Sequence, residues 1–325
     1  MLLLILKVEM IEFEIIGIKE IDIGEISQLI LDVKRSKGEW SDNVDLERVK
    51  QVFLRNFEDT EDAVLLAREQ GELIGLIVIH FDDENTIEMN PWFLGGHPII
   101  HPESSLAQLD SEMIMKAKEY AESIGVARVN IHFMKGQSQL PTLYESLGMT
   151  LFEEVTHLRA DLPELEHITV APPEQVNIIR LEEAPMDKLY DCWYASFESG
   201  QDRSFFTRTQ EQNRTHFEEM FDMDDYDTRA SIALMDNQQV VGFALVKQTH
   251  GERNGHIWEL GVHPDFKRKG YAKLMLAVVR ARLLQDEMRT ISLNYDTSNE
   301  PAMRLYRSYN FEEIWTQMGY TWILE

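Results

Sequence analysis

The sequence predicts an α/β protein made of two tandem copies of one fold, each a mixed, mostly antiparallel twisted sheet flanked by helices. Three observations lead to this prediction: the length of the chain, an internal repeat, and the order of β-rich and helical segments in each half. A soluble domain typically spans about 100–200 residues, so a chain of 325 residues suggests two domains. The hydrophobic fraction of 44% is sufficient for two ordinary cores.

The internal repeat is found when the two halves are compared at a displacement of 162 residues. A repeat of this length indicates a duplicated domain, because solenoid repeats span only about 20–50 residues. We expect domains at 12–165 and 175–325, separated where Pro163, Pro172 and Pro173 interrupt regular structure. The matched pairs are His101-Pro102 with His263-Pro264, Met113 with Met275, and Leu143-Tyr144 with Leu305-Tyr306.

Each half begins with a strand, one or two helices and a β-hairpin. Segments 72–79 and 239–246 resemble each other at a displacement of 167, which implies a five-residue difference in a loop. Turn-forming residues such as Gly71 and Asn237 separate the β-rich runs of the two hairpins. The expected strands are 13–18, 64–68 and 72–81 in the first half, and 177–181, 231–235 and 238–247 in the second.

The second half continues with a strand that ends at Val262, followed by a loop and an amphipathic helix. In that helix Met275, Val279 and Leu283 recur at helical spacing. Antiparallel hairpins followed by a β-helix-β crossover indicate a mixed sheet. The remaining elements are expected to be a strand at 290–295, a short helix at 301–309, and two terminal strands at 311–316 and 320–324.

The charge balance indicates which partners the chain can have. The sequence holds 31 basic and 57 acidic residues, for a net charge of -26. Such a surface repels nucleic acids and anionic membranes, which bind an excess of Lys and Arg. We therefore expect no nucleic-acid or membrane partner, and a preference for cationic small molecules or peptides.

Cysteine usage and the start of the chain suggest a cytoplasmic protein. Cys192 is the only cysteine, so an internal disulfide and a cysteine-based zinc site are excluded, and no metal is expected. No cation neighbours Cys192 in the sequence, which favours an inert thiol. The apolar opening at 1–6 lacks the features of a signal peptide or a membrane span, and Met10 is an alternative start to Met1.

The most informative stretch in the chain is 259–272. A strand stops before Pro264, a basic loop follows, and Gly270 begins an amphipathic helix. Glycine leaves space for a ligand to approach the backbone, and the amides of a first helical turn attract phosphate. The alternative interpretation is a solvated basic loop at the start of a helix. Four cations cluster in this loop and first turn: Lys267, Arg268, Lys269 and Lys273.

A second stretch, 299–311, follows the next strand, and together the two resemble the GCN5-related N-acetyltransferase (GNAT) family. The family signature is a strand ending V-x-P, a loop [R/Q]-x-x-G-x-[G/A], and about thirty residues later N-x-x-A-x-x-L-Y-x-x-x-G-F. Two positions depart from it: Lys267 stands where Arg or Gln is usual, and Asn310 replaces Gly. The resemblance covers roughly 178–325. The matching residues are Val262, Pro264, Lys267, Gly270, Ala272, Asn299, Ala302, Leu305, Tyr306 and Phe311.

The resemblance implies a set of roles for acetyl-CoA and for catalysis. Glu259 would be the general base, and Tyr306 would donate a proton or hydrogen bond to the departing thiolate. Asn299 would contact the pantetheine arm or the adjacent backbone. The alternatives are a surface role for Glu259 and a packing role for Tyr306. Main-chain groups of Leu260, Gly261 and Val262 would pair with pantetheine and the acyl carbonyl, and the pyrophosphate would be held by the loop and first turn: Lys267, Arg268, Lys269, Gly270, Tyr271 and Ala272.

The first half lacks the residues that this role needs. At the displacement of 162, the segment 105–110 lies opposite the basic loop and contains no cation. Gln108 replaces Gly270, and Asp110 places a negative charge in the first helical turn, where it repels a pyrophosphate. Gln137 is then opposite Asn299 and His97 opposite Glu259. We expect 12–165 to have the fold without binding CoA, and 175–325 to bind acetyl-CoA.

The function expected from the resemblance is transfer of an acetyl group from acetyl-CoA to a primary amine of a small molecule or peptide. An alkyl amine with a pKa of about 10.4 is protonated at neutral pH, so a carboxylate base is needed. Two alternatives remain: a non-catalytic acyl-CoA-binding module, and an aminoacyl-tRNA-dependent transferase, which the net charge disfavours. Five aromatic residues of the helical region are candidates for either core or acceptor pocket: Trp193, Tyr194, Phe197, Phe205 and Phe206.

Overall fold

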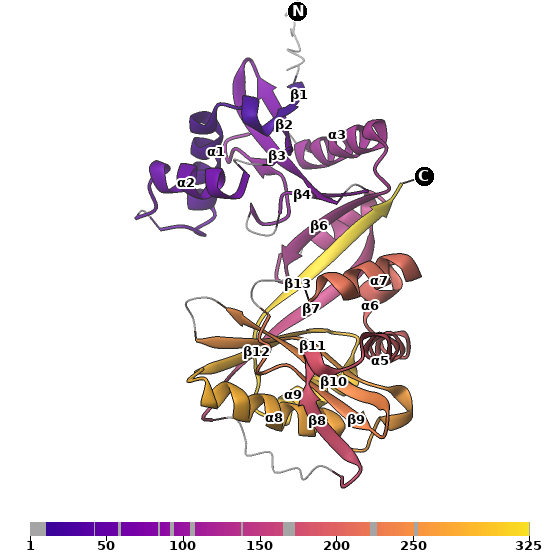
Figure 1. The fold of residues 1–325 in the computed structure, drawn as a ribbon. Coiled ribbons are helices and arrows are strands. Elements are labelled where there is room, and N and C mark those ends of the chain that lie inside the picture. The colour runs from indigo at the N-terminus through magenta and orange to yellow at the C-terminus, as the bar shows by residue number, and fades with distance from the viewer. Residues whose placement is uncertain are drawn as a thin grey trace, which may run out of the picture. The chain divides into compact units, whose positions relative to one another are not determined.

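The chain forms two compact units in a computed structural model, Met1–Leu151 together with Met318–Glu325, and Phe152–Gln317 (Figure 1). These bounds differ from the expected domains 12–165 and 175–325, because two long strands pass from one unit to the other. The opening segment, part of the loop 105–110 and most of the expected linker lie outside the described residues. The structure describes residues 11–41, 43–57, 60–83, 85–91, 94–104, 108–137, 139–164, 173–221, 226–249 and 253–324.

The first unit contains a mixed sheet in the order β1-β2-β3-β4-β6, with β5 paired to β3. Strands β1 to β4 pair antiparallel, and β4 pairs parallel with β6 across a helical crossover. Its elements are β1 (Ile11–Gly17), a 3₁₀ turn (Ile18–Glu20), α1 (Ile23–Ser36), α2 (Leu46–Phe57), β2 (Ala63–Glu69), β3 (Glu72–Asp83), β4 (Thr86–Met89), β5 (Ile99–Ile100), α3 (Leu109–Ile124), β6 (Arg128–Met134) and α4 (Leu140–Ser146).

The second unit repeats this order of elements, with its sheet ordered β8-β9-β10-β11-β12-β7. Only β11 and β12 are parallel among its recorded pairings. Its elements are β7 (Thr150–Asp161), β8 (Val176–Arg180), a 3₁₀ turn (Leu181–Glu183), α5 (Met186–Glu198), α6 (Arg203–Phe206), α7 (Gln210–Glu219), β9 (Ile232–Asp236), β10 (Gln239–Thr249), β11 (Asn254–Val262), a 3₁₀ turn (Pro264–Phe266), α8 (Tyr271–Gln285), β12 (Thr290–Asp296), α9 (Glu300–Arg307) and β13 (Glu312–Ile323).

The C-terminal strand corrects one expectation. Two separate strands were expected at 311–316 and 320–324, but β13 runs without a break from Glu312 to Ile323. Its last residues complete the first unit, where Tyr320 and Trp322 are buried in the core. The sequence shows no periodicity change that marks this passage, since β-rich residues continue through the strand.

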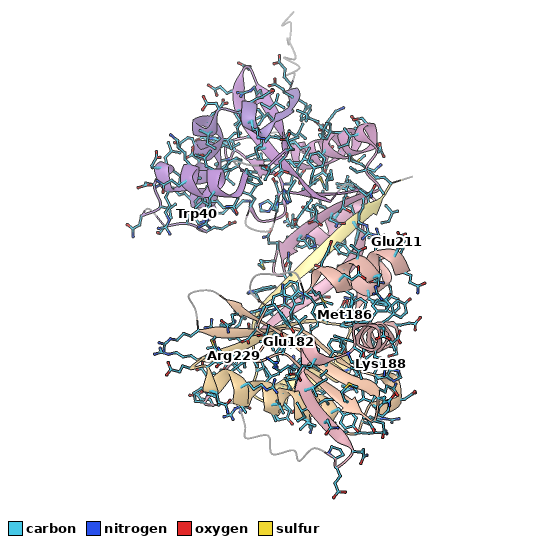
Figure 2. The ribbon with its side chains drawn as sticks, in the orientation of Figure 1. Trp40, Glu182, Met186, Lys188, Glu211 and Arg229 are labelled. Atoms are coloured by element: carbon cyan, nitrogen blue, oxygen red, sulfur yellow. The ribbon has the colours of Figure 1, made fainter. Side chains whose placement is uncertain are left out.

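The second unit buries a core on each face of its sheet. Along the later part of β10 the side chains alternate: Ala244 and Val246 pack toward α8 and α9, whereas Phe243 and Leu245 pack toward α5, α6 and α7. Charged residues such as Glu182 and Glu211 remain exposed (Figure 2). Among the described residues, no helix is long and apolar enough to cross a membrane.

The two units share packing details that the sequence repeat predicts. A Cβ on Gly75 of β3 would lie 2.6 Å from the sulfur of Met113, and a Cβ on Gly242 of β10 would lie 3.3 Å from the sulfur of Met275. In both units, therefore, a glycine of the central strand lets the same methionine of the crossover helix pack against the sheet. The duplication thus extends to side-chain packing.

Candidate active site

The site in the second unit begins where two parallel strands separate. Strand β11 pairs with β12 from Asn254 to Ile257, and then continues to Val262 while paired with β10 alone. A bulge at Trp258 interrupts the register with β10, and such bulges re-aim the strand that carries them. The backbone of Leu260, Gly261 and Val262 therefore follows the end of the β11–β12 pairing, which leaves it able to pair with an extended ligand.

The loop after β11 is shaped to receive an anion. Arg268 and Gly270 both have left-handed backbone conformations, with φ of 65° and 85°. Gly270 is the N-cap of α8, and no side chain caps the helix there. A Cβ on Gly270 would meet no atom within 4 Å, so this turn faces open space. Backbone amides in such a concave turn at a helix N-terminus attract phosphate groups.

The basic side chains of this loop differ in what they contact. The Lys267 ammonium lies 2.9 Å from the hydroxyl of Ser199, so it connects the loop to the end of α5. The Lys269 ammonium lies 4.3 Å from the ring centroid of Phe266. Arg268 is exposed, and its guanidinium has no recorded partner within the described part of the chain. Arg268 is thus the cation of the loop best placed to reach a phosphate.

Asn299 and Tyr306 both belong to α9. The side-chain oxygen of Asn299 accepts a hydrogen bond from the amide of Ala302 and so caps the helix. Tyr306 is buried between β12 and the terminal strand, with ring centroids 6.3 Å from Tyr295 and 5.7 Å from Phe311. Burial raises the pKa of Tyr306, and the nearby carboxylate of Glu259 raises it further. The tyrosine therefore keeps its proton, as a hydrogen-bond donor must.

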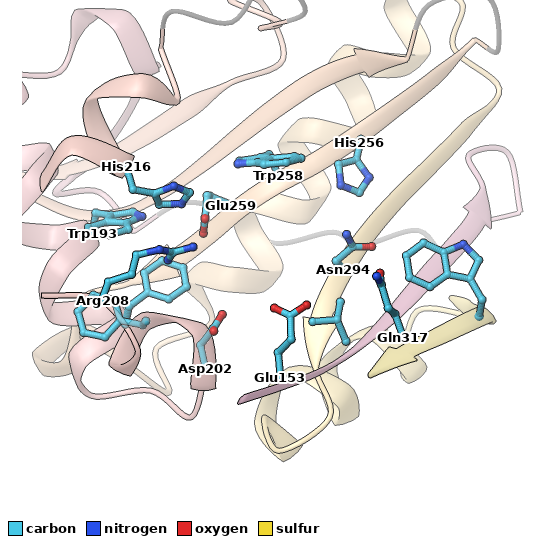
Figure 3. Close-up of a pocket in the computed structure, with 14 residues that line it drawn as sticks. Glu153, Trp193, Asp202, Arg208, His216, His256, Trp258, Glu259, Asn294 and Gln317 are labelled. Atoms are coloured by element: carbon cyan, nitrogen blue, oxygen red, sulfur yellow. The ribbon is translucent and has the colours of Figure 1, made fainter. Parts of the chain in front are cut away.

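Glu259 lines a cavity of about 250 Å³ in the second unit (Figure 3). The cavity combines an apolar wall with several ionisable groups. The aromatic residues of the wall are Trp193, Phe197, Phe205, Trp258 and Trp315. The ionisable residues are Glu153, Asp202, Arg208, His216, His256 and Glu259.

The electrostatics of the cavity favour a proton-transfer role for Glu259. Loss of solvent contact raises the pKa of Glu259 to about 8; Asp202 raises it too, while Arg208 and Lys247 oppose the shift. A carboxylate with a pKa near the working pH is suited to general-base catalysis. Desolvation, with Arg208 and Lys247, lowers the pKa of His216 to about 4, so this imidazole is neutral at physiological pH.

The first unit differs from the second at the place that corresponds to Glu259. In the second unit, three residues (258–260) separate Ile257 and Gly261, the two partners of Val246 and Phe243 on β10. In the first unit, nine residues (90–98) separate the corresponding partners on β3, Met89 and Ile99. At the displacement of 162, which holds for Ile99 and Gly261, His97 lies opposite Glu259 at the end of this longer segment. Within this segment, a Cβ on Gly96 would collide with the carbonyl oxygen of His132 on β6. The segment is thus packed directly against the strand that corresponds to β12.

The hydroxyl of Tyr144 also contacts the segment that contains Gly96. Tyr144 corresponds to Tyr306, and its hydroxyl donates a 2.7 Å hydrogen bond to the carbonyl oxygen of Gly96. Gln108 is the N-cap of α3 with φ 78° and ψ 8°, nearly the same backbone as Gly270 with φ 85° and ψ 7°. The Asp110 carboxylate accepts the amide of Ser111 in the first turn of α3. In the first unit, therefore, the tyrosine hydroxyl and an amide of the first helical turn already have hydrogen-bond partners within the protein.

Sequence reasoning found the β11 and α9 residues but missed most of the cavity. Asp202, Arg208 and His216 come from the helical region between β8 and β9, and no local pattern marks them as neighbours of Glu259. The aromatic candidates proved to have both roles, since Trp193, Phe197 and Phe205 line the cavity and belong to or pack against the core. Phe206 is 58% exposed, and Tyr194 packs against that core.

Three other residues, Cys192, His263 and His101, have surroundings that indicate a structural role. Cys192 is buried, and desolvation raises the pKa of its thiol to about 12, so it stays protonated. His263 accepts the amide of Asp265 at its ring nitrogen, and His101 accepts the amide of Glu103 in the same way. Among the described residues, no group of three or more His, Cys, Asp or Glu side chains could hold a metal ion.

Comparisons with known proteins agree with the fold. Residues 186–311 match the acetyltransferase (GNAT) family. A mycothiol acetyltransferase of Streptomyces griseus subsp. griseus is 25% identical over 190 residues, which cover 57% of this chain and 58% of that protein. The matched segments span 58%, 50% and 61% of the first three curated relatives, all of them mycothiol acetyltransferases.

Solved structures show that the whole chain has this fold. A GCN5-related N-acetyltransferase from Sphaerobacter thermophilus covers 95% of this chain and is itself covered to 95%, with a TM-score of 0.62 and 16% identity. A tandem GNAT protein from the clavulanic acid biosynthesis pathway covers 96% of the chain, and 98% of it is covered, with a TM-score of 0.56 and 13% identity. Residues 186–311 are therefore similar to the GNAT acetyltransferase family, and the chain shares its fold with tandem GNAT proteins.

Proposed function

We propose that the second unit transfers an acetyl group from acetyl-CoA to a primary amine. The observation that carries this proposal is the pairing of Glu259 and Tyr306, which lie close enough for the Glu259 charge to raise the pKa of Tyr306. One group is suited to accept a proton and the other to donate one. Both lie next to the point where β11 and β12 separate, beside a helix N-terminus that is open to an anion.

The reaction would proceed by direct attack. The carboxylate of Glu259 takes a proton from the ammonium of the acceptor, and the free amine nitrogen attacks the thioester carbonyl carbon. The new C–N bond forms, and the carbonyl electrons move to oxygen and return as the C–S bond breaks. The hydroxyl of Tyr306 donates its hydrogen to the sulfur that leaves, so that CoA departs as a thiol. The nitrogen loses a second proton to solvent as the amide forms, and the proton taken by Glu259 returns through solvent to the Tyr306 oxygen, which restores both groups.

The same arrangement suggests which residues contact each part of acetyl-CoA. The pyrophosphate would lie on the amides that follow Gly270, with Arg268 beside it, and the pantetheine would pair with the free edge of Leu260 to Val262. Asn299 caps α9 through its oxygen, which leaves its side-chain NH₂ as a donor for the arm. No step of this reaction requires a metal.

The first unit is proposed not to bind acetyl-CoA. Gly96 packs against His132 of β6 and its carbonyl oxygen accepts the Tyr144 hydroxyl, so protein atoms occupy the space beside this tyrosine. Gln108 also places a side chain on the turn where Gly270 has none. A cytoplasmic location is part of the proposal, because a single cysteine suits a reducing compartment.

The test is turnover of a panel of primary amines, measured as release of free CoA thiol. Glu259→Gln should lower kcat roughly 10²–10⁴-fold, as expected for loss of a general base. Tyr306→Phe should lower kcat about tenfold, the value of one hydrogen bond of about 1.4 kcal/mol in the transition state. Tyr144→Phe is the matched control in the first unit and should leave kcat unchanged.

Two results would contradict the proposal in different ways. Full turnover by Glu259→Gln would remove Glu259 from the chemistry. Binding of acetyl-CoA without turnover of any amine would instead indicate a non-catalytic acyl-CoA-binding module.

A further inference from the structure

Arg208 is a cation in the cavity that forms no recorded ion pair with a described residue. It lies between α6 and α7, is partly buried, and lines the cavity together with Glu259. No hydrogen bond or ion pair of its guanidinium is recorded with any residue that the structure describes. Other arginines of the unit do have carboxylate partners: Arg203 pairs with Asp296 at 3.1 Å, and Arg214 with Glu218 at 2.6 Å.

A second donor in the cavity also lacks a partner. The indole N–H of Trp193 is buried with no hydrogen-bond acceptor among the described residues. Figure 3 shows the nitrogen end of Trp193 directed toward His216 and Glu259, with the Arg208 guanidinium below the Glu259 carboxylate. A buried donor without an acceptor costs about 1–3 kcal/mol, and more when it is charged. A binding site can keep such unpaired donors, because a bound ligand supplies the missing acceptor.

The geometry of a guanidinium indicates what that ligand group is. The planar fork of arginine matches the two oxygens of a carboxylate, and the paired interaction is strong because both groups are charged. A carboxylate is also a pure acceptor, so it satisfies donors without adding an unpaired hydrogen. Glu259 lies within electrostatic range of Arg208, and it is the group that we propose receives the amine proton. The acceptor must therefore bring an amine and a carboxylate to neighbouring positions.

The wall of the cavity defines the rest of the acceptor. Trp193, Phe197 and Phe205 pack around one another, with ring centroids of Trp193 5.3 Å from Phe197 and 5.7 Å from Phe205. Trp258 and Trp315 add two further indole rings to the lining. Such a wall buries apolar or aromatic groups and offers little to a strongly hydrated chain.

We propose that Arg208 binds the carboxylate of the acceptor, and that the acceptor is a small zwitterion with an apolar or aromatic side chain, such as a free amino acid. This inference rests on the proposed function, since it names the acceptor class of the same site. The rival interpretation is that Arg208 acts only on Glu259, by adjusting its charge. The two interpretations differ in whether the effect of Arg208 depends on the acceptor's own carboxylate.

The experiment compares three acceptors that differ at one group: L-phenylalanine, L-phenylalaninamide and phenethylamine, with the other amino acids and their amides as a wider panel. Each is assayed with the full chain and acetyl-CoA, for wild type, Arg208→Gln and Arg208→Lys. Arg214→Gln is the control, because Arg214 is paired with Glu218 on the exposed side of α7. Retention of the acetyl-CoA-induced rise in Tm shows that each variant is folded.

We expect Arg208→Gln to lower kcat/KM for the amino acid by about 10- to 100-fold, mostly through KM, and to change the amide and the amine by less than about threefold. Arg208→Lys should retain part of the preference for the carboxylate, and Arg214→Gln all of it. An equal loss for all three acceptors, or a wild-type preference for amines without a carboxylate, would overturn the inference while leaving the proposed function in place. If no amine of any class is acetylated, the proposed function itself fails, and the inference fails with it.

Discussion

At the scale of single residues, the site contains two groups, Glu259 and Tyr306, whose surroundings both raise the pKa. Glu259 is held protonated more strongly than an exposed glutamate, mainly because it is desolvated. Tyr306 is held protonated for the same reason. The acid keeps its proton at all physiological pH values, whereas the base titrates close to them. This difference supports the proposed roles of Tyr306 as proton donor and Glu259 as proton acceptor.

The first prediction at this scale concerns pH. Since Glu259 acts when ionised and its pKa is raised to about 8, kcat/KM should rise about tenfold per pH unit below pH 8 and level off above it. Asp202→Asn removes a negative neighbour, so the pKa of Glu259 falls and the rise should move to lower pH. The titration of the acceptor amine is the same in both proteins and cannot produce that displacement. Coincident profiles for wild type and Asp202→Asn would show that Glu259 does not govern the pH dependence.

At the scale of elements, the turn before the crossover helix separates the two units most clearly. Gly270 and Gln108 have almost the same backbone angles at the N-caps of α8 and α3. The turn itself therefore tolerates a side chain, at a strain of about 1–3 kcal/mol. The difference between the units is the residue on the turn: Gly270 has no side chain and faces open space, whereas Gln108 carries a side chain.

An exchange of these two residues tests the role of the turn. Acetyl-CoA at about 100 times its Kd should stabilise the wild-type protein by roughly 2.7 kcal/mol, seen as a rise in Tm, with one acetyl-CoA bound per chain. Gly270→Gln should remove both the rise and the binding, because the side chain occupies the phosphate position. Gln108→Gly is the matched control and should behave as wild type. A second acetyl-CoA bound per wild-type chain would show that the first unit is open after all.

The sequence predicts these elements well and the cavity poorly, for physical reasons. The motif around Gly270 and Tyr306 is local, so spacing alone places the turn on a helix N-terminus and the tyrosine on the next helix. The repeat also predicts that Met275 and Met113 pack in equivalent places. By contrast, Asp202 and Arg208 reach Glu259 only through the packing of helices on the sheet, which leaves no periodic trace. The inserted segment 90–98 is likewise visible only once the strand register is known.

At the scale of the whole molecule, the end of the chain belongs to the first unit. Residues Met318–Glu325 group with Met1–Leu151, although some 166 residues of the second unit, Phe152–Gln317, separate them in the sequence. Tyr320 donates a 3.0 Å hydrogen bond to Glu145, and the indole N–H of Trp322 donates to the carbonyl oxygen of Leu147 at 3.1 Å. A fragment that ends near residue 165 therefore lacks part of its own core, so the expected domain 12–165 is not a folding unit in this sense.

Because the C-terminal residues belong to the first unit, a substitution there should destabilise that unit. Trp322 is 6% exposed in the core of the first unit, so Trp322→Ala should destabilise that unit by about 3–5 kcal/mol. Ile323 is 65% exposed, and Ile323→Ala should change stability by less than about 0.5 kcal/mol. Denaturant unfolding with and without acetyl-CoA distinguishes the units, because the ligand stabilises only the unit that binds it. Trp322→Ala should lower the transition that acetyl-CoA leaves unchanged; a loss confined to the ligand-sensitive transition would mean that the terminal strand supports the second unit instead.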